Sequence, residues 1–259
     1  MAEVIELYQP SAEVRKKLEK MSVLILTPCK DHEVPAVFSQ SVTNMVSYSH
    51  LNGLKVYQHC VVERMVVHWA RNELARLAQA HVSGYTGQRY THVLWLDDDH
   101  VFNPDLLLCL ARHDVDMVSA LYFGRVGRHL PVVYVKDDTP NKYMHYQILE
   151  IPPRLCEVDA TGFGACLMRM EVLDRIPAPW FKFEDAGEDI YFCVHAKEAG
   201  VKVHVDGSYV LGHIGESQVV TQETYMRFME SKREEYADRV RVPLGGSNGA
   251  DNLGSRSPH

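Results

Sequence analysis

The sequence lacks any apolar run long enough to span a membrane. The apolar runs at 23–26, 93–96 and 106–110 fall far below the roughly 18 to 20 residues that a bilayer requires. Residues 1–20 mix acidic and basic side chains and contain no apolar stretch of the kind found in secretion signals. We therefore expect no membrane span and a cytoplasmic location.

Closely spaced cysteine pairs are also missing. The six cysteines include no C-x-x-C pair, which is the spacing of many zinc and redox sites. Because a cytoplasmic compartment keeps thiols reduced, we expect free thiols rather than a disulfide framework.

An excess of basic charge is absent as well. The chain carries 27 Lys+Arg and 34 Asp+Glu, which gives a formal net charge of −7. This balance offers no basic footprint of the kind that nucleic-acid binding normally uses. With 46% hydrophobic and 24% charged residues, the 259-residue chain has the composition of an ordinary globular protein of one or two domains.

Apolar patterning in the first half of the chain predicts alternating strands and helices. Residues 22–31 are a continuous apolar run stopped by Thr27-Pro28, as in a strand buried on both faces. Apolar residues recur every three or four positions over 61–80, which indicates an amphipathic helix. Strands are also expected at 91–100 and 116–124, separated by a helix at 103–113 with Asn103 as N-cap and Pro104 at its first position. This order predicts an α/β fold with a mostly parallel central sheet and helices on both faces.

The remaining patterns predict shorter elements. Helices are expected at 11–20, 171–176 and 188–200, and strands at 131–135, 143–151 and 201–215. The residues after Pro243 are rich in Gly, Ser and Asn, which predicts a disordered tail over 244–259.

The sharpest chemical feature is Asp97-Asp98-Asp99, at the end of an expected strand. Adjacent carboxylates repel one another unless a cation neutralises them, and alternation along a strand points Asp97 and Asp99 to one side. Carboxylate oxygens are hard ligands that suit divalent cations. The buried strand before the triplet and the helix after it favour a metal site, because α/β proteins bind ligands where strands end. The alternative is a solvated acidic turn or a helix cap.

Further motifs follow in a fixed order along the chain. They are Thr27-Pro28, Arg71-Asn72, the D-x-D at 97–99, DATGFGACLMR at 159–169, GEDIYFC at 187–193 and GHIG at 212–215. This series resembles the nucleotide-sugar glycosyltransferases of the GT-A fold, family-2-like, and is especially similar to the short ones encoded by bacteriophages. The resemblance implies an N-terminal extension at 1–21 and a single Rossmann-like GT-A catalytic domain over 22–243. Within it, 22–124 would be the nucleotide-binding half and 125–243 the acceptor-binding half.

The resemblance also implies a metal cofactor. It places a Mn²⁺ or Mg²⁺ ion on Asp97, Asp99 and His213, with Asp97 also near the ribose of the donor. Such an ion acts as a Lewis acid that stabilises charge on the departing nucleoside diphosphate. A lone histidine is more often structural, so the place of His213 in the series carries this assignment.

Several residues are assigned to the sugar nucleotide in the same way. Thr27, Pro28 and Asp31 would line the nucleobase pocket, and the guanidinium of Arg71 suits phosphate oxygens. The small Gly162 would let the backbone approach the sugar, a β-bulge or tight turn being the alternative. The implied donor-binding residues are Thr27, Pro28, Asp31, Arg71, Asn72, Asp97, Asp98, Gly162, Phe163 and Gly164.

An acidic pair, Glu188-Asp189, begins the helix expected at 188–200. In inverting members of the family an Asp in an E-D pair removes the proton from the acceptor hydroxyl. The resemblance implies this role for Asp189, with Glu188 as a supporting residue. Ordinary capping of a helix N-terminus is the alternative.

The function predicted in this way is metal-dependent, inverting transfer of a hexose from a nucleotide sugar, with a UDP-sugar as the donor, to a hydroxyl acceptor. The acceptor is open between a DNA base, a protein and a glycan. The phage relatives suggest a hydroxymethylated pyrimidine in DNA, and the location would then be the host cytoplasm. A retaining mechanism would keep the same D-x-D.

Two other functions stay open. A nucleotidyltransferase also uses carboxylate-bound metal, but residues 27–35 offer no Gly-rich phosphate loop. A nucleotide- or sugar-binding module would keep the fold without turnover.

Overall fold

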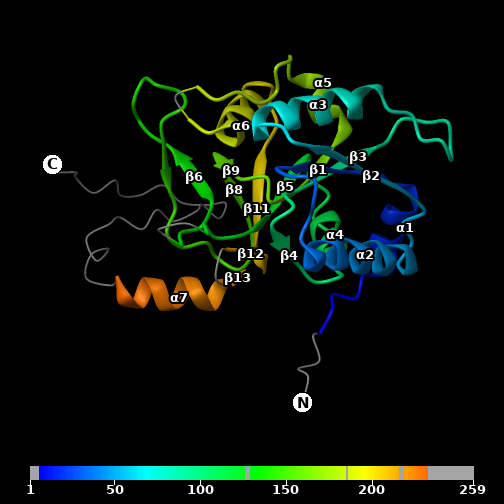
Figure 1. The fold of residues 1–259 in the computed structure, drawn as a ribbon, viewed down its shortest axis with the longest axis horizontal. Coiled ribbons are helices and arrows are strands. Elements are labelled where there is room, and N and C mark those ends of the chain that lie inside the picture. Colours follow the sequence, from blue (N-terminus) through cyan, green and yellow to red (C-terminus); the bar gives the residue numbers. More distant parts are fainter. Residues whose placement is uncertain (1–5, 126–128, 185, 216–218, 233–259) are drawn as a thin grey trace.

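A seven-stranded sheet forms the centre of the computed structural model, which describes residues 6–125, 129–184, 186–215 and 219–232 (Figure 1). Its strands are β1 (Ser22–Cys29), β2 (Val56–Glu63), β3 (His92–Leu96), β5 (Met117–Leu121), β8 (Leu155–Val158), β10 (Ala165–Arg169) and β11 (Val203–Val210). They lie in the order β2-β1-β3-β10-β5-β11-β8. β1 is parallel to β2 and β3, and β11 is parallel to β5, whereas β10 and β8 are antiparallel to their neighbours. The sheet is therefore mostly parallel, as predicted.

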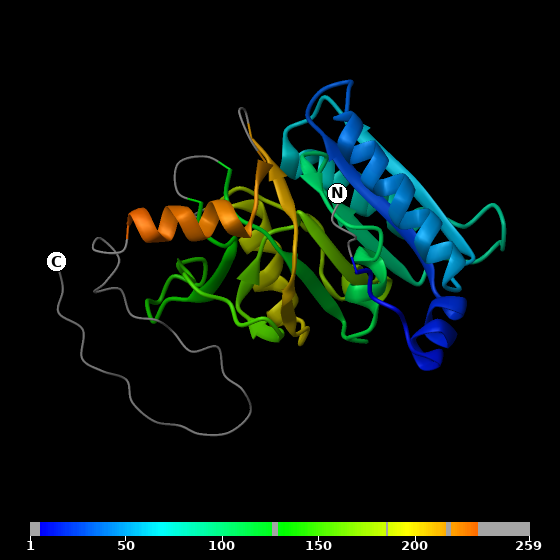
Figure 2. The same ribbon diagram turned by 90° about the horizontal axis from the view of Figure 1, so that it is seen from below.

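Helices cover both faces of this sheet. On one face lie α3 (Val67–Ala80), α5 (Met170–Arg175) and α6 (Glu188–Glu198), and on the other α1 (Ala12–Lys20), α2 (Ala36–Leu51) and α4 (Leu106–Ala111). Figure 1 shows α3, α5 and α6 above the sheet and α2 and α4 below it, and Figure 2 shows α2 running alongside the strands. A hydrophobic core lies on each face of the sheet, and alternate residues of β1 point into one or the other. Leu24 packs with the first set of helices and Ile25 with the second. The expected α/β class with helices on both faces is confirmed.

Two small sheets complete the fold. One contains β4 (His100–Val101), β12 (Gly212–Ile214) and β13 (Val219–Val220), and the other β6 (Val133–Lys136), β7 (His145–Gln147) and β9 (Ala160–Thr161). The antiparallel pairing of β4 with β12 sets His100 opposite His213. The last described helix, α7 (Gln222–Ser231), stacks the ring of Tyr225 on that of Phe123, with 4.5 Å between centroids.

Two helix boundaries expected from the sequence are wrong, and several elements were not foreseen, among them β2, α2, the central strand β10 and α7. Residues 61–63 of the expected helix belong to β2, and α3 begins only at Val67. β2 is an edge strand on which exposed and half-buried residues alternate, so it lacks the continuous apolar run by which β1 is recognised. The helix α2, which precedes it, has no counterpart among the predicted elements.

The helix expected at 103–113 is also shorter than predicted. It begins at Leu106, so neither Asn103 nor Pro104 has its expected place. The N-cap residue is Asp105, but its carboxylate does not cap α4. It accepts hydrogen bonds from the Tyr8 amide (2.7 Å) and the Tyr209 hydroxyl (3.2 Å), which bind the N-terminal segment and β11 instead.

Three further expectations concern the whole chain. All six cysteines are free thiols, as predicted. Among the described residues, no helix combines the length and the apolarity that crossing a bilayer would demand. The tail predicted at 244–259 lies outside the described residues.

Candidate functional site

A cleft of about 1370 Å³ opens where β1, β2 and β3 end. Its walls are residues 28–35 after β1, residues 64–67 after β2, and Asp97 to His100 after β3. Arg71, Tyr122, Arg125, Glu188, Asp189 and His213 complete the lining. The carboxyl ends of parallel strands are the edge at which open α/β sheets bind ligands.

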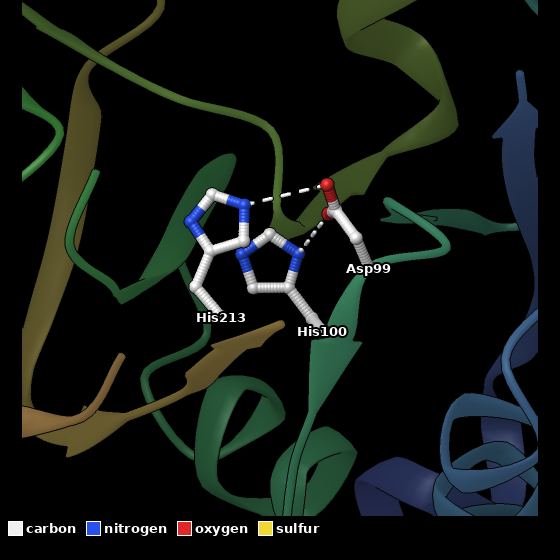
Figure 3. Close-up of side chains that lie close together, drawn as sticks. All are labelled: Asp99, His100 and His213. Atoms are coloured by element: carbon white, nitrogen blue, oxygen red, sulfur yellow. Dashed lines mark ion pairs between the residues drawn. The ribbon is translucent and has the colours of Figure 1, made fainter. Parts of the chain in front are cut away.

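Asp99, His100 and His213 form a compact group in this cleft (Figure 3). Their potential ligand atoms all lie within 4.8 Å of one another. Asp99 Oδ1 is 3.1 Å from His100 Nδ1, and Asp99 Oδ2 is 3.4 Å from His213 Nε2. The two imidazoles stack with 4.4 Å between centroids and an interplanar angle of 16°. Pairing of β4 with β12 thus brings together residues that lie 113 positions apart.

The protonation pattern of this group suits a cation. His213 Nδ1 lies 2.8 Å from the carbonyl oxygen of Phe123, so it carries the proton and leaves the Nε2 lone pair facing Asp99. Neither ring nitrogen of the buried His100 has a hydrogen bond among the described residues. A buried imidazole without a partner is costly, and a cation shared with Asp99 would satisfy it. The residues present therefore fit a divalent metal ion.

Asp99 is held ionised. Burial acts to raise its pKa, but the adjacent imidazoles of His100 and His213 outweigh burial and hold the pKa well below its usual range. The guanidinium of Arg125 also forms an ion pair with Asp99 Oδ2. Asp99 therefore carries a negative charge within the group that it forms with the two histidines.

Asp97 has a different environment from Asp99. Both of its oxygens accept hydrogen bonds from Arg71 Nη2, at 2.8 and 3.0 Å, and Arg71 Nη1 donates to Glu188 Oε1 at 2.7 Å. Arg71 is almost completely buried, with its guanidinium over the Phe163 ring at 5.3 Å. Burial acts to lower the pKa of Arg71, but the charges of Asp97 and Glu188 raise it overall. Arg71 therefore ties the end of β3 to the start of α6, and Asp97 lies outside the group formed by Asp99 and the histidines.

The two acids at the start of α6 also differ from each other in whether they are paired with an arginine. Glu188 is paired with Arg71, whereas Asp189 accepts only the Ile190 amide among the hydrogen bonds of the described residues, at 2.8 Å. Burial, reinforced by the charge of Glu188, raises the pKa of Asp189 to about 6. A carboxyl with such a pKa can accept a proton near neutral pH, which is what a general base requires.

Asp98 faces the first strand. Burial raises its pKa, partly offset by a hydrogen bond with the Cys29 thiol. That thiol also donates to the Asp31 carbonyl oxygen at 3.0 Å. The contact fixes the loop after β1, which supplies Pro28 and Asp31 to the cleft wall.

Five residues assigned to the donor do not line the cleft. Thr27 is fully buried and its hydroxyl lies 2.9 Å from His59 Nε2. The amide of Asn72 bonds to the backbone of Trp180 and Phe181, so it joins α3 to the segment before α6. Phe163 is fully buried among aromatic rings beneath Arg71. Gly162 and Gly164 also lie away from the cleft wall, and the donor-binding roles of these five residues stay predictions.

The glycines at 162 and 164 have a clear steric role. A Cβ on Gly162 would lie 1.8 Å from the Tyr122 hydroxyl, and one on Gly164 would lie 2.8 Å from His100 Cε1 and Nε2. The segment around Phe163 therefore makes room for two side chains that line the cleft.

His100 and Tyr122 are site residues that the sequence did not predict. Tyr122 lies edge-on to both His100 and His213, and its hydroxyl has no hydrogen-bond partner among the described residues. The signals for these residues were weak: His100 directly follows the acidic triplet, and Tyr122 ends a strand of the sheet. The pairing of β4 with β12 places His100 beside His213, and Tyr122, which follows β5, contacts both rings.

Comparison with known proteins supports the fold. No family model and no curated protein matches the sequence. The structure is similar to the crystal structure of A197 from STIV, with a TM-score of 0.54 and 19% identity over 79% of this chain and 92% of that one. GalNAc-T7 with UDP, GalNAc and Mn²⁺ matches with a TM-score of 0.49 and 12% identity over 84% of this chain and 50% of that one. Glucosyl-3-phosphoglycerate synthase from Mycobacterium tuberculosis, with Mn²⁺, UDP and phosphoglyceric acid, matches with a TM-score of 0.45 and 13% identity over 81% and 77%.

Proposed function

We propose that this protein is a metal-dependent, inverting glycosyltransferase of the GT-A type that transfers a hexose from a UDP-sugar to a hydroxyl acceptor. One observation carries the proposal. A single cleft at the carboxyl ends of β1 to β3 contains both a cation-binding group (Asp99, His100 and His213) and an acid with a raised pKa, Asp189. The two halves of the reaction, departure of a diphosphate and activation of a hydroxyl, need these two features.

The cation-binding group would hold the metal ion, which acts as a Lewis acid on the departing diphosphate. Two imidazoles and one carboxylate are softer than the oxygen ligands that Mg²⁺ prefers, so the group favours Mn²⁺. Arg125, which is already paired with Asp99, adds positive charge beside the diphosphate. Asp97 would remain paired with Arg71 and, because it lines the cleft, would contact the ribose.

Asp189 would act as the general base. Its carboxylate takes the proton of the acceptor hydroxyl while the hydroxyl oxygen forms a bond to the anomeric carbon. The bond from that carbon to the diphosphate oxygen breaks, and its electron pair leaves with UDP. Glu188 is held by Arg71 and keeps Asp189 in place at the N-terminus of α6.

The loops after β1 and β2 would hold the nucleoside. Pro28 and Asp31 line this side of the cleft. We therefore expect 22–124 to supply most of the nucleotide site.

The test is release of UDP from UDP-sugars with and without Mn²⁺, after a thermal-shift screen of UDP-, GDP- and dTDP-sugars. We expect Mn²⁺-dependent UDP release in wild type, none with Asp99→Ala, and retained nucleotide binding without transfer with Asp189→Asn. Product analysis on hydroxymethylated DNA, proteins and glycans then identifies the acceptor. Pyrophosphate release from a nucleoside triphosphate would instead indicate a nucleotidyltransferase. Binding of UDP and Mn²⁺ without any release would indicate a binding module.

A further inference from the structure

An exposed apolar surface adjoins the cleft. Its members, which we call the rim patch, are Met65, Val66, Trp69 and Phe183, with exposed fractions of 45%, 54%, 62% and 55%. Met65 and Val66 line the cleft itself, and Trp69 lies one turn further along α3, where its amide donates to the Val66 carbonyl oxygen. Large apolar side chains gathered at the mouth of a cleft mark a contact surface.

The rim patch is continuous across two segments of the chain. The His68 ring contacts Trp69 at 5.5 Å and Phe183 at 5.4 Å between centroids, in each case edge to face. Asn72 fastens this part of α3 to the backbone of Phe181. The aromatic side chains are therefore presented on a fixed frame.

The same frame leads to the acid pair. Phe183 precedes α6, whose first residues are Glu188 and Asp189, and Arg71 joins α3 to Glu188. An acceptor that rests on Trp69 and Phe183 would thus lie at the end of the cleft where the proposed base is found.

The charges around the patch decide what kind of acceptor suits it. Lys182, next to Phe183, is paired with Glu184, and Arg76, two turns along α3 from Trp69, is paired with Glu73, so these two cations are neutralised. Surfaces that bind single-stranded nucleic acid combine aromatic rings with a positively charged groove. A protein interface normally needs about 20 to 30 residues on each side. A sugar ring needs neither a positively charged groove nor a large interface. Its C–H face is small and apolar, and its hydroxyl groups remain in water at the edge of the patch.

We propose that the rim patch is the acceptor subsite and that it binds a carbohydrate ring, stacked on Trp69 and flanked by Phe183. This inference rests on the proposed function and names its acceptor class as a glycan or glycoside rather than a DNA base. The nucleotide keeps the other side of the cleft, with Pro28 and Asp31.

Trp69 itself provides the direct assay. Of the three tryptophans, Trp95 has no exposed surface and Trp180 has 6%, so acrylamide quenching of fluorescence reports mainly on Trp69. The probes are methyl glucoside, cellobiose, laminaribiose and N,N′-diacetylchitobiose, with a hydroxymethylcytosine oligonucleotide as the competing class. We expect at least one sugar to protect Trp69 from acrylamide, and no protection by the oligonucleotide.

Kinetics provide the second assay. With a protecting sugar as acceptor, Trp69→Ala and Phe183→Ala should each raise the acceptor KM about tenfold, the size expected for loss of one aromatic contact. The donor KM should stay the same. Tyr85→Ala is the matched control, because Tyr85 is 84% exposed but lies beyond the opposite end of α3.

The outcomes separate this inference from the proposed function. UDP release without protection of Trp69 by any sugar would overturn the inference and leave the function standing. Protection by the oligonucleotide alone, or an acceptor KM unchanged in both variants, would overturn it too. Absence of UDP release from every donor would overturn the function, while quenching would still show whether sugar binds.

Discussion

His100 and His213 stack face to face with 4.4 Å between their ring centroids, although they belong to different strands. The stack exists because β4 and β12 pair antiparallel and because Gly164 leaves room for His100. Both rings turn a nitrogen toward Asp99 (Figure 3). The arrangement is a preformed set of ligand atoms.

His213→Gln should weaken Mn²⁺ binding by about 100-fold or more, because the variant loses an imidazole ligand from the group. The matched control is His204→Gln. His204 Nδ1 also lies near a backbone carbonyl, that of Met117 at 3.1 Å, but outside the cleft. Titration calorimetry with Mn²⁺ measures both variants. Equal affinity in the His213 and His204 variants would remove His213 from the metal site.

Tyr122→Phe should lower kcat/KM for transfer about tenfold, which corresponds to the loss of one hydrogen bond of about 1.4 kcal/mol. Tyr122 lines the cleft, and its hydroxyl, which lies beside Gly162, has no hydrogen-bond partner among the described residues, so we expect a substrate oxygen to accept its hydrogen bond. The melting temperature should stay the same for that reason. Tyr209→Phe should show the opposite pattern, since its hydroxyl bonds to Asn103 and Asp105 away from the cleft. Full activity in Tyr122→Phe would exclude the contact.

The pH profile of transfer should show an acidic limb. Burial and the charge of Glu188 raise the pKa of Asp189 to about 6, and a base works only when deprotonated. Activity should therefore rise as pH increases through about 6, and the limb should appear in kcat/KM, which reflects the free enzyme. Rate measurements with Mn²⁺-saturated enzyme from about pH 5 to about pH 8 check this, because that range spans the Asp189 pKa of about 6. The residual rate of Asp189→Asn should lack the limb, and a limb that persists there would assign it to another group.

The sequence predicted more of the fold than of the site. Continuous apolar runs identify β1 and β3 because both faces of these strands are buried, and the acids that follow them lie in the cleft as strand polarity requires. β2 escapes detection because it is an edge strand with one side exposed. The apolar residues at the end of β2 continue into those of α3, so in the sequence the end of the strand is read as part of the helix.

Within the site, local motifs identify residues but not their partners. Arg71 is recognisable from its motif, yet its burial against Asp97 and Glu188, which lie 26 and 117 positions away, depends on the assembled sheet. The same holds for His100, which meets His213 only through strand pairing. Long-range contacts of this kind have no signature in one sequence.

A buried carboxylate remote from the cleft should control stability in acid. Asp206 is fully buried in β11 and lies 2.7 Å from His113 Nε2 and 3.0 Å from Arg112 Nη2. Burial acts to raise its pKa, but the hydrogen bonds from His113 and Ser208 prevail and lower it to about 2. Since this pKa is depressed on folding, the ionised group stabilises the protein above the unfolded value of about 4. The stabilisation is lost as pH falls toward 2.

Asp206→Asn should therefore lower the free energy of unfolding by about 2 kcal/mol at pH 7, with the difference from wild type shrinking as the pH falls below about 4. Urea unfolding at a series of pH values measures this difference. Asp174→Asn is the control, because Asp174 forms a comparable pair with Arg89 at 2.7 Å but on the surface, where such pairs contribute little. If the two variants lost equal stability at pH 7, burial would not be the reason for the strength of the Asp206 contacts. A pH-independent loss in Asp206→Asn would show that its charge contributes nothing.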